Sequence, residues 1–372
     1  MTMLSPSPKK ILALKLRSLG DTVLMTASLN ELKKAFPNAE IHVAVTSTWA
    51  PLLESHPAIK KLWTYDRYAE RGARAKAAAR LALRLRKERF DCVVNFHASP
   101  SSSMISFATG ARVRSIHFHG HKDRNRHSTV TVPGKGILKP IIERDMDTLR
   151  ALGIHAPAGR LPQIYLQESE KSDARDTLSR LSLPLPMLMI GLGASRPTKR
   201  WPVDRFASLA VEWATKKQGG VLAIAGPDEL TEAHAFLKAV DDHLLMAVPD
   251  AAERAQVRAR ITSENRLPLR KLAALISQAS VFVGNDSGPR HIAVAVETPS
   301  VTLFGPEHPF EWHPYPTDRH PYHFIDGLAC RRDALPGYPA WCGIEPCVVE
   351  QHQCMRLIGV DQVFAECERV SK

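Results

Sequence analysis

The sequence contains no apolar run of the roughly 20 residues that a helix needs to cross a lipid bilayer. It begins MTMLSPSPKK, which is too short and polar for a signal peptide and leads directly into a predicted strand. We therefore expect a cytoplasmic protein. With 372 residues, 44% of them hydrophobic and 24% charged, the chain has a globular composition and enough length for two domains.

Cysteine is also scarce, with six residues in the chain. Cys92 stands alone on a predicted strand, where we expect a small buried hydrophobic residue. The other five gather near the C-terminus: Cys330, Cys342, Cys347, Cys354 and Cys367. In a cytosolic protein such a group indicates a metal before a disulfide, yet no two of them form a C-x-x-C pair. We expect no required metal, and all of the five except Cys367 are weak candidate ligands for iron or zinc.

Two further motifs are missing. No D-x-D follows a predicted strand, so the sequence lacks the paired carboxylates that hold a Mg²⁺-bridged diphosphate in some nucleotide-sugar enzymes. The basic stretches have no interleaved aromatic residues and no recognition motif, which argues against a nucleic-acid partner.

Positive charge is present in excess but is confined to one half of the chain. The net charge is +12, and residues 1–160 hold 27 Lys and Arg against 12 Asp and Glu, a net of +15. A basic half predicts an anionic partner, and charge alone does not choose among nucleic acid, an acidic membrane surface and a phosphorylated substrate. Much of the charge lies on a predicted helix at 68–89, whose basic residues form either a solvated face or a platform for a phosphorylated glycolipid at an acidic membrane.

Apolar runs alternate with helical patterns in both halves, which predicts an α/β protein with two doubly wound, Rossmann-like domains. The expected strands are 10–16, 41–45, 62–65, 92–96, 187–193, 221–226 and 244–248, before a strand–helix–strand unit at 281–306. The charged segment 249–266 is interpreted as a solvated insertion, and 117–136 as a long basic loop. Ligands of such sheets bind at the carboxyl ends of the strands.

The unit at 281–306, VFVGNDSGPRHIAVAVETPSVTLFGP, is the most specific part of the sequence. Its turn places Asp286, Ser287 and Gly288 at the start of a helix, where free N–H groups and the helix dipole suit a phosphate. Either Asp286 or Ser287 can cap that helix, and Gly288 allows close approach of a ligand. A second motif, LRSLGD at 16–21, ends the first strand; taken alone, Asp21 is most simply a helix N-cap.

Together these two motifs resemble glycosyltransferase family 9, the bacterial heptosyltransferases, and H-x-C-M-x-x-I at 352–358 is also similar to that family. One local departure is Ala27, where the family usually has Pro. The resemblance implies a GT-B architecture, in which two Rossmann-like domains face a central cleft. The implied domains are an acceptor-binding domain at 1–180, a nucleotide-sugar domain at 181–355 and, at 356–372, a C-terminal helix packing back on the first domain.

The resemblance also implies roles for individual residues. Asp21 matches the candidate general base, which takes the proton of the acceptor hydroxyl. Lys199, in K-x-W-P, matches a contact to the donor phosphates, and a cation there stabilises the leaving group. The full donor-binding set is Ser195, Thr198, Lys199, Asp228, Leu267, Asp286, Ser287, Gly288 and His291. The acceptor-binding set is Arg17, Arg71, Arg74, His97, Lys122, Arg124 and Arg126.

The expected activity is an inverting, metal-independent transfer of heptose from ADP-heptose to a lipopolysaccharide inner-core acceptor, at the cytoplasmic face of the inner membrane. Members of the same family with a protein or small-molecule acceptor remain an alternative. A nucleotide-sugar epimerase is less favoured because it needs an acid/base pair around the sugar. A non-catalytic nucleotide-sugar-binding module with a Cys-bound metal also remains open. Nothing in the residues themselves selects adenine over other bases.

Overall fold

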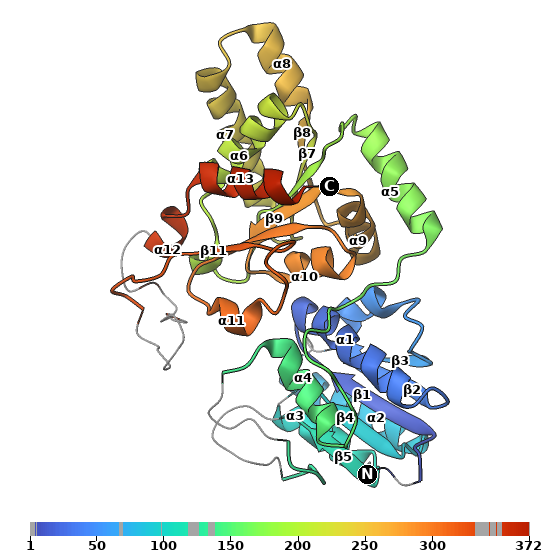
Figure 1. The fold of residues 1–372 in the computed structure, drawn as a ribbon. Coiled ribbons are helices and arrows are strands. Elements are labelled where there is room, and N and C mark those ends of the chain that lie inside the picture. Colours follow the sequence, from blue (N-terminus) through green and yellow to red (C-terminus); the bar gives the residue numbers. More distant parts are fainter. Residues whose placement is uncertain are drawn as a thin grey trace. The chain divides into compact units, whose positions relative to one another are not determined.

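The computed structural model describes residues 4, 6–66, 70–97, 99–117, 126–132, 138–331, 342, 347 and 352–371. The chain forms two compact units, 1–165 and 166–372. Each is a parallel sheet with helices on both faces, as Figure 1 shows. Among the described residues, no helix has both the length and the apolar character needed to cross a membrane.

The first sheet has the order β3-β2-β1-β4-β5, with all pairs parallel. Its strands are β1 (Lys10–Lys15), β2 (Glu40–Thr46), β3 (Lys61–Tyr65), β4 (Cys92–Asn95) and β5 (Val113–Ile116). Its helices are α1 (Leu19–Ala35), the 3₁₀ helix η1 (Ser47–Leu53), α2 (Arg71–Lys87), α3 (Pro100–Ala108) and α4 (Ile141–Arg150). Helix α1 packs against α4, and α2 packs against α3. The predicted strands and the long basic helix are confirmed here.

Strand β1 shows why this unit folds as it does. Leu12 and Leu14 lie in one apolar cluster with Leu81 and Leu85 of α2. Because side chains alternate across a strand, Lys15 points to the opposite face, where α1 and α4 pack.

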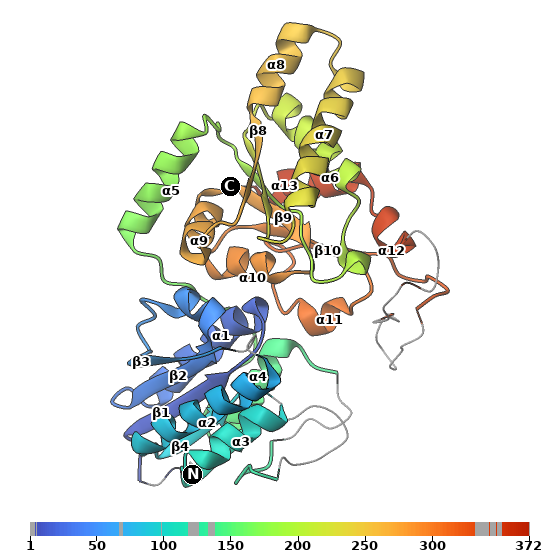
Figure 2. The ribbon, with the colours of Figure 1, turned by 180° about the vertical axis from the view of Figure 1, so that it is seen from behind.

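The second sheet has the order β11-β10-β9-β6-β7-β8, again parallel throughout. Figure 2 shows its strands β8, β9 and β10 from behind. Its strands are β6 (Leu188–Gly191), β7 (Val221–Ala225), β8 (Ile261–Asn265), β9 (Val281–Asn285), β10 (Ser300–Phe304) and β11 (Tyr322–Phe324). Its helices are α5 (Glu168–Arg180), η2 (Pro197–Lys199), α6 (Val203–Lys216), α7 (Leu230–Ala247), α8 (Ala251–Ala259), α9 (Leu269–Gln278), α10 (Gly288–Ala295), α11 (Pro309–Trp312), α12 (Gln353–Arg356) and α13 (Val360–Val370).

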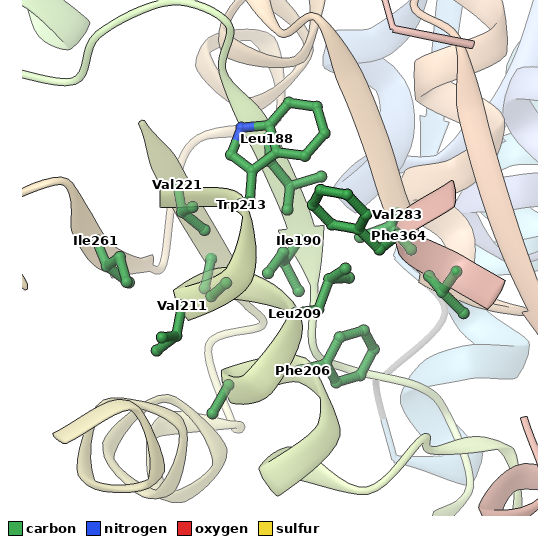
Figure 3. Close-up of a cluster of buried hydrophobic side chains, with 14 of the residues drawn as sticks. Leu188, Ile190, Phe206, Leu209, Val211, Trp213, Val221, Ile261, Val283 and Phe364 are labelled. Carbon is green, nitrogen blue, oxygen red and sulfur yellow. The ribbon is translucent and has the colours of Figure 1, made fainter. Parts of the chain in front are cut away.

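The core of the second unit includes the C-terminal helix. Figure 3 shows Trp213 and Phe206 of α6 packed with strand residues and with Phe364 of α13. The expectation that residues 356–372 pack back on the first domain stays a prediction. Helix α13 packs on α6, β9 and β10, because Val363, Phe364 and Cys367 form its apolar stripe.

The boundary between the units also differs from the expected 180. Helix α5 belongs to the second unit, where it packs against α9 and Glu170 forms an ion pair with Arg270. This polar, charge-rich stretch is a helix whose Ala174 and Leu178 are buried.

The predicted strand at 244–248 is wrong, since this run lies mostly in helix α7. Buried Ala233, Phe236, Val240 and Leu244 recur at helical spacing, and the neighbouring Leu245 and Met246 are exposed. A short apolar run does not distinguish strand from helix by itself. The supposed insertion at 249–266 contains α8 and β8, so β8 is the strand that the prediction placed too early.

Two glycines offer a paired test of this packing. A Cβ at Gly219 would overlap the Pro186 carbonyl oxygen and approach the Trp213 Nε1 within 2.6 Å, whereas a Cβ at Gly72, in the first turn of α2, meets nothing within 4 Å. We expect Gly219→Ala to lower stability by about 1–3 kcal/mol and Gly72→Ala to raise it by up to about 1 kcal/mol. Thermal unfolding of both variants tests this; shifts of the same sign would contradict it.

Candidate functional site

Each sheet has one place where the chain reverses the direction in which it adds strands. In the first sheet it lies between β1 and β4, and in the second between β6 and β9. Ligands of doubly wound folds bind at the carboxyl ends of the strands at such points. The first turn of α1, just after β1, carries Asp21, and the loops after β6 and β9 carry Lys199 and Asp286. The fold thus gives each unit one candidate site.

In the first unit, Ser18 rather than Asp21 caps helix α1. The Ser18 hydroxyl accepts from the Asp21 backbone N–H at 3.5 Å and donates to the Asp21 Oδ2 at 2.5 Å. The interpretation of Asp21 as the N-cap is therefore wrong. Asp21 stands in the first turn, where its carboxylate is held by the capping residue and favoured by the helix dipole.

Asp21 is buried beside two cations. Lys15 Nζ lies 3.7 Å from its Oδ1 and Arg17 Nε lies 3.6 Å from its Oδ2. Burial alone would raise the pKa of Asp21, but the charges of Lys15 and Arg17 outweigh it and hold the pKa below its usual value. Within the described residues, Oδ1 accepts no hydrogen bond. The side chain is a buried, ionised carboxylate whose Oδ1 has no hydrogen-bond donor among the described residues.

The structure gathers some of the predicted acceptor residues and not others. Arg17 and His97 both act electrostatically on Asp21, which places them at the same sheet edge. Arg74 is exposed on α2, and exposed Arg126 contacts the His127 ring. Arg71 begins α2, but its side chain lies outside the described part of the chain, as do Lys122 and Arg124.

In the second unit, Asp286 is the centre of an ion cluster. One carboxylate oxygen accepts from Lys199 Nζ at 2.7 Å and the other from Arg290 Nη2 at 2.6 Å, with Arg290 fully buried. Burial opposes ionisation, yet Arg290 and Lys199 hold the pKa of Asp286 well below its usual range. Burial likewise lowers the pKa of Lys199, against the opposing charge of Asp286.

Sequence reasoning missed three charged members of this cluster. Arg290 follows Asp286 by one helical turn, a spacing that could have revealed the pair. Glu307, after β10, pairs with Arg196 and lies 3.4 Å from Lys199 Nζ. No local pattern connects Glu307 to Lys199, because 108 positions separate them and only the fold joins them.

Asn285, at the end of β9, fixes the loop that carries Lys199. Its amide donates to the Leu192 carbonyl at 2.8 Å, and its oxygen accepts from the Trp201 backbone N–H at 2.8 Å. In this loop the Thr198 hydroxyl is buried and makes no hydrogen bond to any described residue, whereas Ser195 is exposed. The Thr198 hydroxyl is thus a buried donor without a partner among the described residues, near the β6 strand end.

The α10 turn holds the remaining predicted residues. Ser287 is the N-cap of α10 without a side-chain cap bond, and Gly288 begins the helix. His291 is buried and shares a hydrogen bond with the Tyr315 hydroxyl. Burial and the Arg290 charge keep the pKa of His291 well below its usual value, so the ring is neutral. The neutral ring is positioned by Tyr315, a partner that no motif suggested.

The loop after β7 offers two carboxylates. Asp228 is exposed, whereas Glu229 accepts from the Gly226 N–H at 2.7 Å, and its carboxylate fills the space beside Gly193. Glu229 also pairs with Arg200. Leu267 is half-buried just after β8. Of the two carboxylates, Glu229 is therefore the one directed toward the β6 strand end.

The cysteines do not form a metal centre in the described part of the chain, where no three His, Cys, Asp or Glu side chains are arranged to hold an ion. The thiols of Cys330, Cys342 and Cys347 do act electrostatically on Cys354, and burial raises the pKa of Cys354 to about 11. These thiols therefore lie near one another, and no step of the chemistry is assigned to them.

Comparison with known proteins agrees with this geometry. The model of glycosyltransferase family 9 (heptosyltransferase) matches residues 78–322. The chain belongs to glycosyltransferase family 9. It is similar to lipopolysaccharide heptosyltransferase 3 of Escherichia coli, with 26% identity over 305 residues that cover 80% of this chain and 83% of the relative.

Two solved structures share the fold of this family 9 protein. One is the family 9 glycosyltransferase from Veillonella parvula DSM 2008, with a TM-score of 0.74 and 20% identity over 97% of both chains. The other is E. coli ADP-heptose lps heptosyltransferase II, with a TM-score of 0.72 and 21% identity over 97% of this chain and 98% of that one. The predicted family, the glycosyltransferase class and the GT-B fold of two Rossmann-like domains are confirmed.

The ion cluster predicts a strong effect of Asp286→Asn on stability. Without the carboxylate, fully buried Arg290 loses its ion-pair partner and Lys199 keeps only Glu307, and we expect a loss of roughly 3–5 kcal/mol. Since the folded-state pKa of Asp286 is depressed, this loss is full at pH 7 and shrinks as pH falls below about 4.

Urea unfolding at several pH values measures this effect. Asp228→Asn, an exposed carboxylate one strand away, is the matched control and should change stability by less than about 0.5 kcal/mol. Equal stabilities of the Asp286 and Asp228 variants at pH 7 would show that the cluster does not stabilise the unit.

Proposed function

We propose that this family 9 protein transfers heptose from ADP-heptose to a lipopolysaccharide inner-core acceptor, with inversion and without a metal ion. The observation that carries the proposal is Asp21: a buried, ionised carboxylate near the end of β1 whose Oδ1 accepts no hydrogen bond from any described residue. Support for heptose and for lipopolysaccharide comes from relatives named as heptosyltransferases of that polymer, and support for ADP-heptose from a structural relative named for it.

Asp21 is the proposed general base. As the acceptor oxygen attacks the anomeric carbon, its proton passes to the carboxylate and the bond to the diphosphate breaks. The leaving ADP needs no proton, so one base suffices for an inverting transfer. The low pKa of Asp21 keeps the carboxylate ionised at neutral pH and ready to accept.

Charged groups of the second unit are proposed to replace a metal at the donor diphosphate. Lys199 supplies a cation, and the α10 N-terminus supplies backbone N–H groups. The buried Thr198 hydroxyl can donate to the same oxygens. Arg290 does not need to touch the donor, because it fixes Asp286 and thereby the position of Lys199.

The acceptor is proposed to reach the enzyme at an anionic membrane surface, with the protein on the cytoplasmic face of the inner membrane. On α2, Lys76, Arg80, Leu83 and Lys87 are exposed and recur at helical spacing. Exposed Met104 and Phe107 lie one turn apart on α3.

The exposed residues of the two helices adjoin one another. One turn after Leu83, Arg86 donates to the carbonyl of Ala108, the neighbour of Phe107. The sequence of α2 contains no acidic residue, so cations surround the apolar side chains of this surface. Basic residues near an anionic bilayer contribute about 1 kcal/mol each, and apolar side chains add insertion.

Asp21→Asn tests the proposed base. The change keeps the shape and removes the proton acceptor, so we expect kcat to fall by about 10²–10⁴-fold. Thermal stabilisation by ADP should be unchanged and should exceed that by UDP or GDP. An Asp21→Asn enzyme with wild-type turnover would refute the base assignment, and a preference for UDP or GDP would refute ADP-heptose as donor.

Vesicle sedimentation tests the membrane surface, which we name the α2–α3 face: Lys76, Arg80, Leu83, Lys87, Met104 and Phe107. The protein should bind phosphatidylglycerol vesicles, lose binding as salt rises, and not bind phosphatidylcholine vesicles. Replacing Leu83, Met104 and Phe107 by Ser should weaken binding at least fivefold. Leu245→Ser/Met246→Ser, on equally exposed α7 positions, is the control. Equal loss in both variants would contradict the assignment.

A further inference from the structure

We propose that Lys15 and Asp145 are positioning residues for Asp21. The Asp145 carboxylate holds the Lys15 ammonium away from Asp21 Oδ1, the oxygen that accepts no hydrogen bond from any described residue. The inference rests on the proposed role of Asp21 as the base. Neither residue belongs to a predicted set, and the contact joins positions 130 residues apart.

The three side chains meet in the interior of the first unit. Lys15 ends the central strand β1 on the face covered by α1 and α4, and it is 1% exposed. Its Nζ lies 2.8 and 2.7 Å from the two oxygens of Asp145, on α4, and 3.7 Å from Asp21 Oδ1. Asp145 is completely buried. The ammonium therefore bonds to Asp145 and only attracts Asp21.

Stability alone does not account for this pair. Desolvating an ammonium and a carboxylate costs about as much as their attraction returns, and apolar residues of similar size often serve a core as well or better. The two residues that flank Lys15 in the sequence, Leu14 in β1 and Leu16 directly after it, are apolar and lie in the hydrophobic cluster on the other face of the sheet. A charged residue at position 15 needs another reason, and the adjacent base supplies one.

The contacts of Lys15 and Asp145 indicate how this pair acts on Asp21. A buried ammonium needs an anionic partner, and Asp21 is the next carboxylate within reach. If Asp145 were neutral, Lys15 would move onto Oδ1, occupy the lone pair that an acceptor hydroxyl requires, and lower the basicity of the carboxylate. With Asp145 ionised, Oδ1 accepts no hydrogen bond from any described residue.

Other charged groups also face this cluster. Arg17 approaches Asp21 from the loop, but its side chain is 37% exposed and screened by solvent. His97 acts on Asp21 from the β4 strand end, and Arg144 acts on Asp145 from α4 itself. Among the residues that the structure describes, only Lys15 forms an ion pair with both carboxylates.

The arrangement also gives the reaction a pH dependence that Asp21 alone would not. Burial raises the pKa of Asp145 to about 6, with Lys15 opposing the shift and Asp21 adding to it. Above this pH, Asp145 is ionised and retains Lys15. Below it, Asp145 takes a proton, Lys15 turns to Asp21, and kcat should decline although Asp21 is still ionised.

The test is the pH profile of kcat for Asp145→Asn, with Asp147→Asn as the matched control. Asp147 is a buried carboxylate on the same helix, but it pairs with Lys139 and Arg150 instead of the Asp21 cluster. We expect Asp145→Asn to lower kcat at pH 8 at least tenfold, to leave the donor KM within twofold, and to abolish the decline near pH 6. Asp147→Asn should keep both kcat and the decline.

Asp145→Glu is the conservative rescue and should recover more of kcat than Asn does, because it restores the charge. A kcat within twofold of wild type in Asp145→Asn at pH 8 overturns the proposal. If that variant does not fold, the wild-type profile decides, since a flat kcat between pH 5 and 7 also overturns it. Asp21→Asn distinguishes failure of the positioning pair from failure of the proposed base. Loss of turnover in Asp21→Asn but not in Asp145→Asn rejects only the positioning pair. Retained turnover in Asp21→Asn rejects Asp21 as the base.

Discussion

The point where a parallel sheet reverses its strand order governs the chemistry of both units. Between β1 and β4, and again between β6 and β9, the connections leave in opposite directions, so the two strand ends are not covered by one crossover. Polar loops can then lie over a buried sheet without breaking its core. Asp21 in one unit, and Lys199 with Asp286 in the other, occupy these places because the alternative positions along the strands are filled by apolar side chains.

Charge compensation is the second constraint, and it takes a similar form in both units. In each unit a lysine lies beside a buried carboxylate. Lys15, at the end of β1, pairs with Asp145, and Lys199, in the loop after β6, pairs with Asp286. A buried ion is tolerated only when its partner is within hydrogen-bond distance, so these pairs fix side-chain positions more firmly than apolar contacts would. In both units the group assigned to the reaction is therefore held in place before any substrate binds.

Much of this architecture could be predicted from the sequence. Alternating apolar runs gave the two α/β units, and the LGD and NDSG turns marked the strand ends where Asp21 and Asp286 lie. The errors came where local signals are ambiguous. A five-residue apolar run at 244–248 fits strand and helix equally, and a polar stretch at 167–180 does not reveal that two of its residues are buried. Asp21 as N-cap failed because the helix begins earlier: Ser18 is the N-cap and accepts from the Asp21 N–H.

The sequence by itself determined the fold class, the family and the turns that carry the motif residues, because these depend on periodicity and on residues near one another in the chain. It also determined the basic character of the first half. Only the tertiary structure decided which charges meet. Lys15 with Asp145, Lys199 with Asp286 and Glu307, and His291 with Tyr315 are joined across strands and helices. Residue spacing along the chain carries no information about such contacts, since they arise when separate elements pack on one sheet.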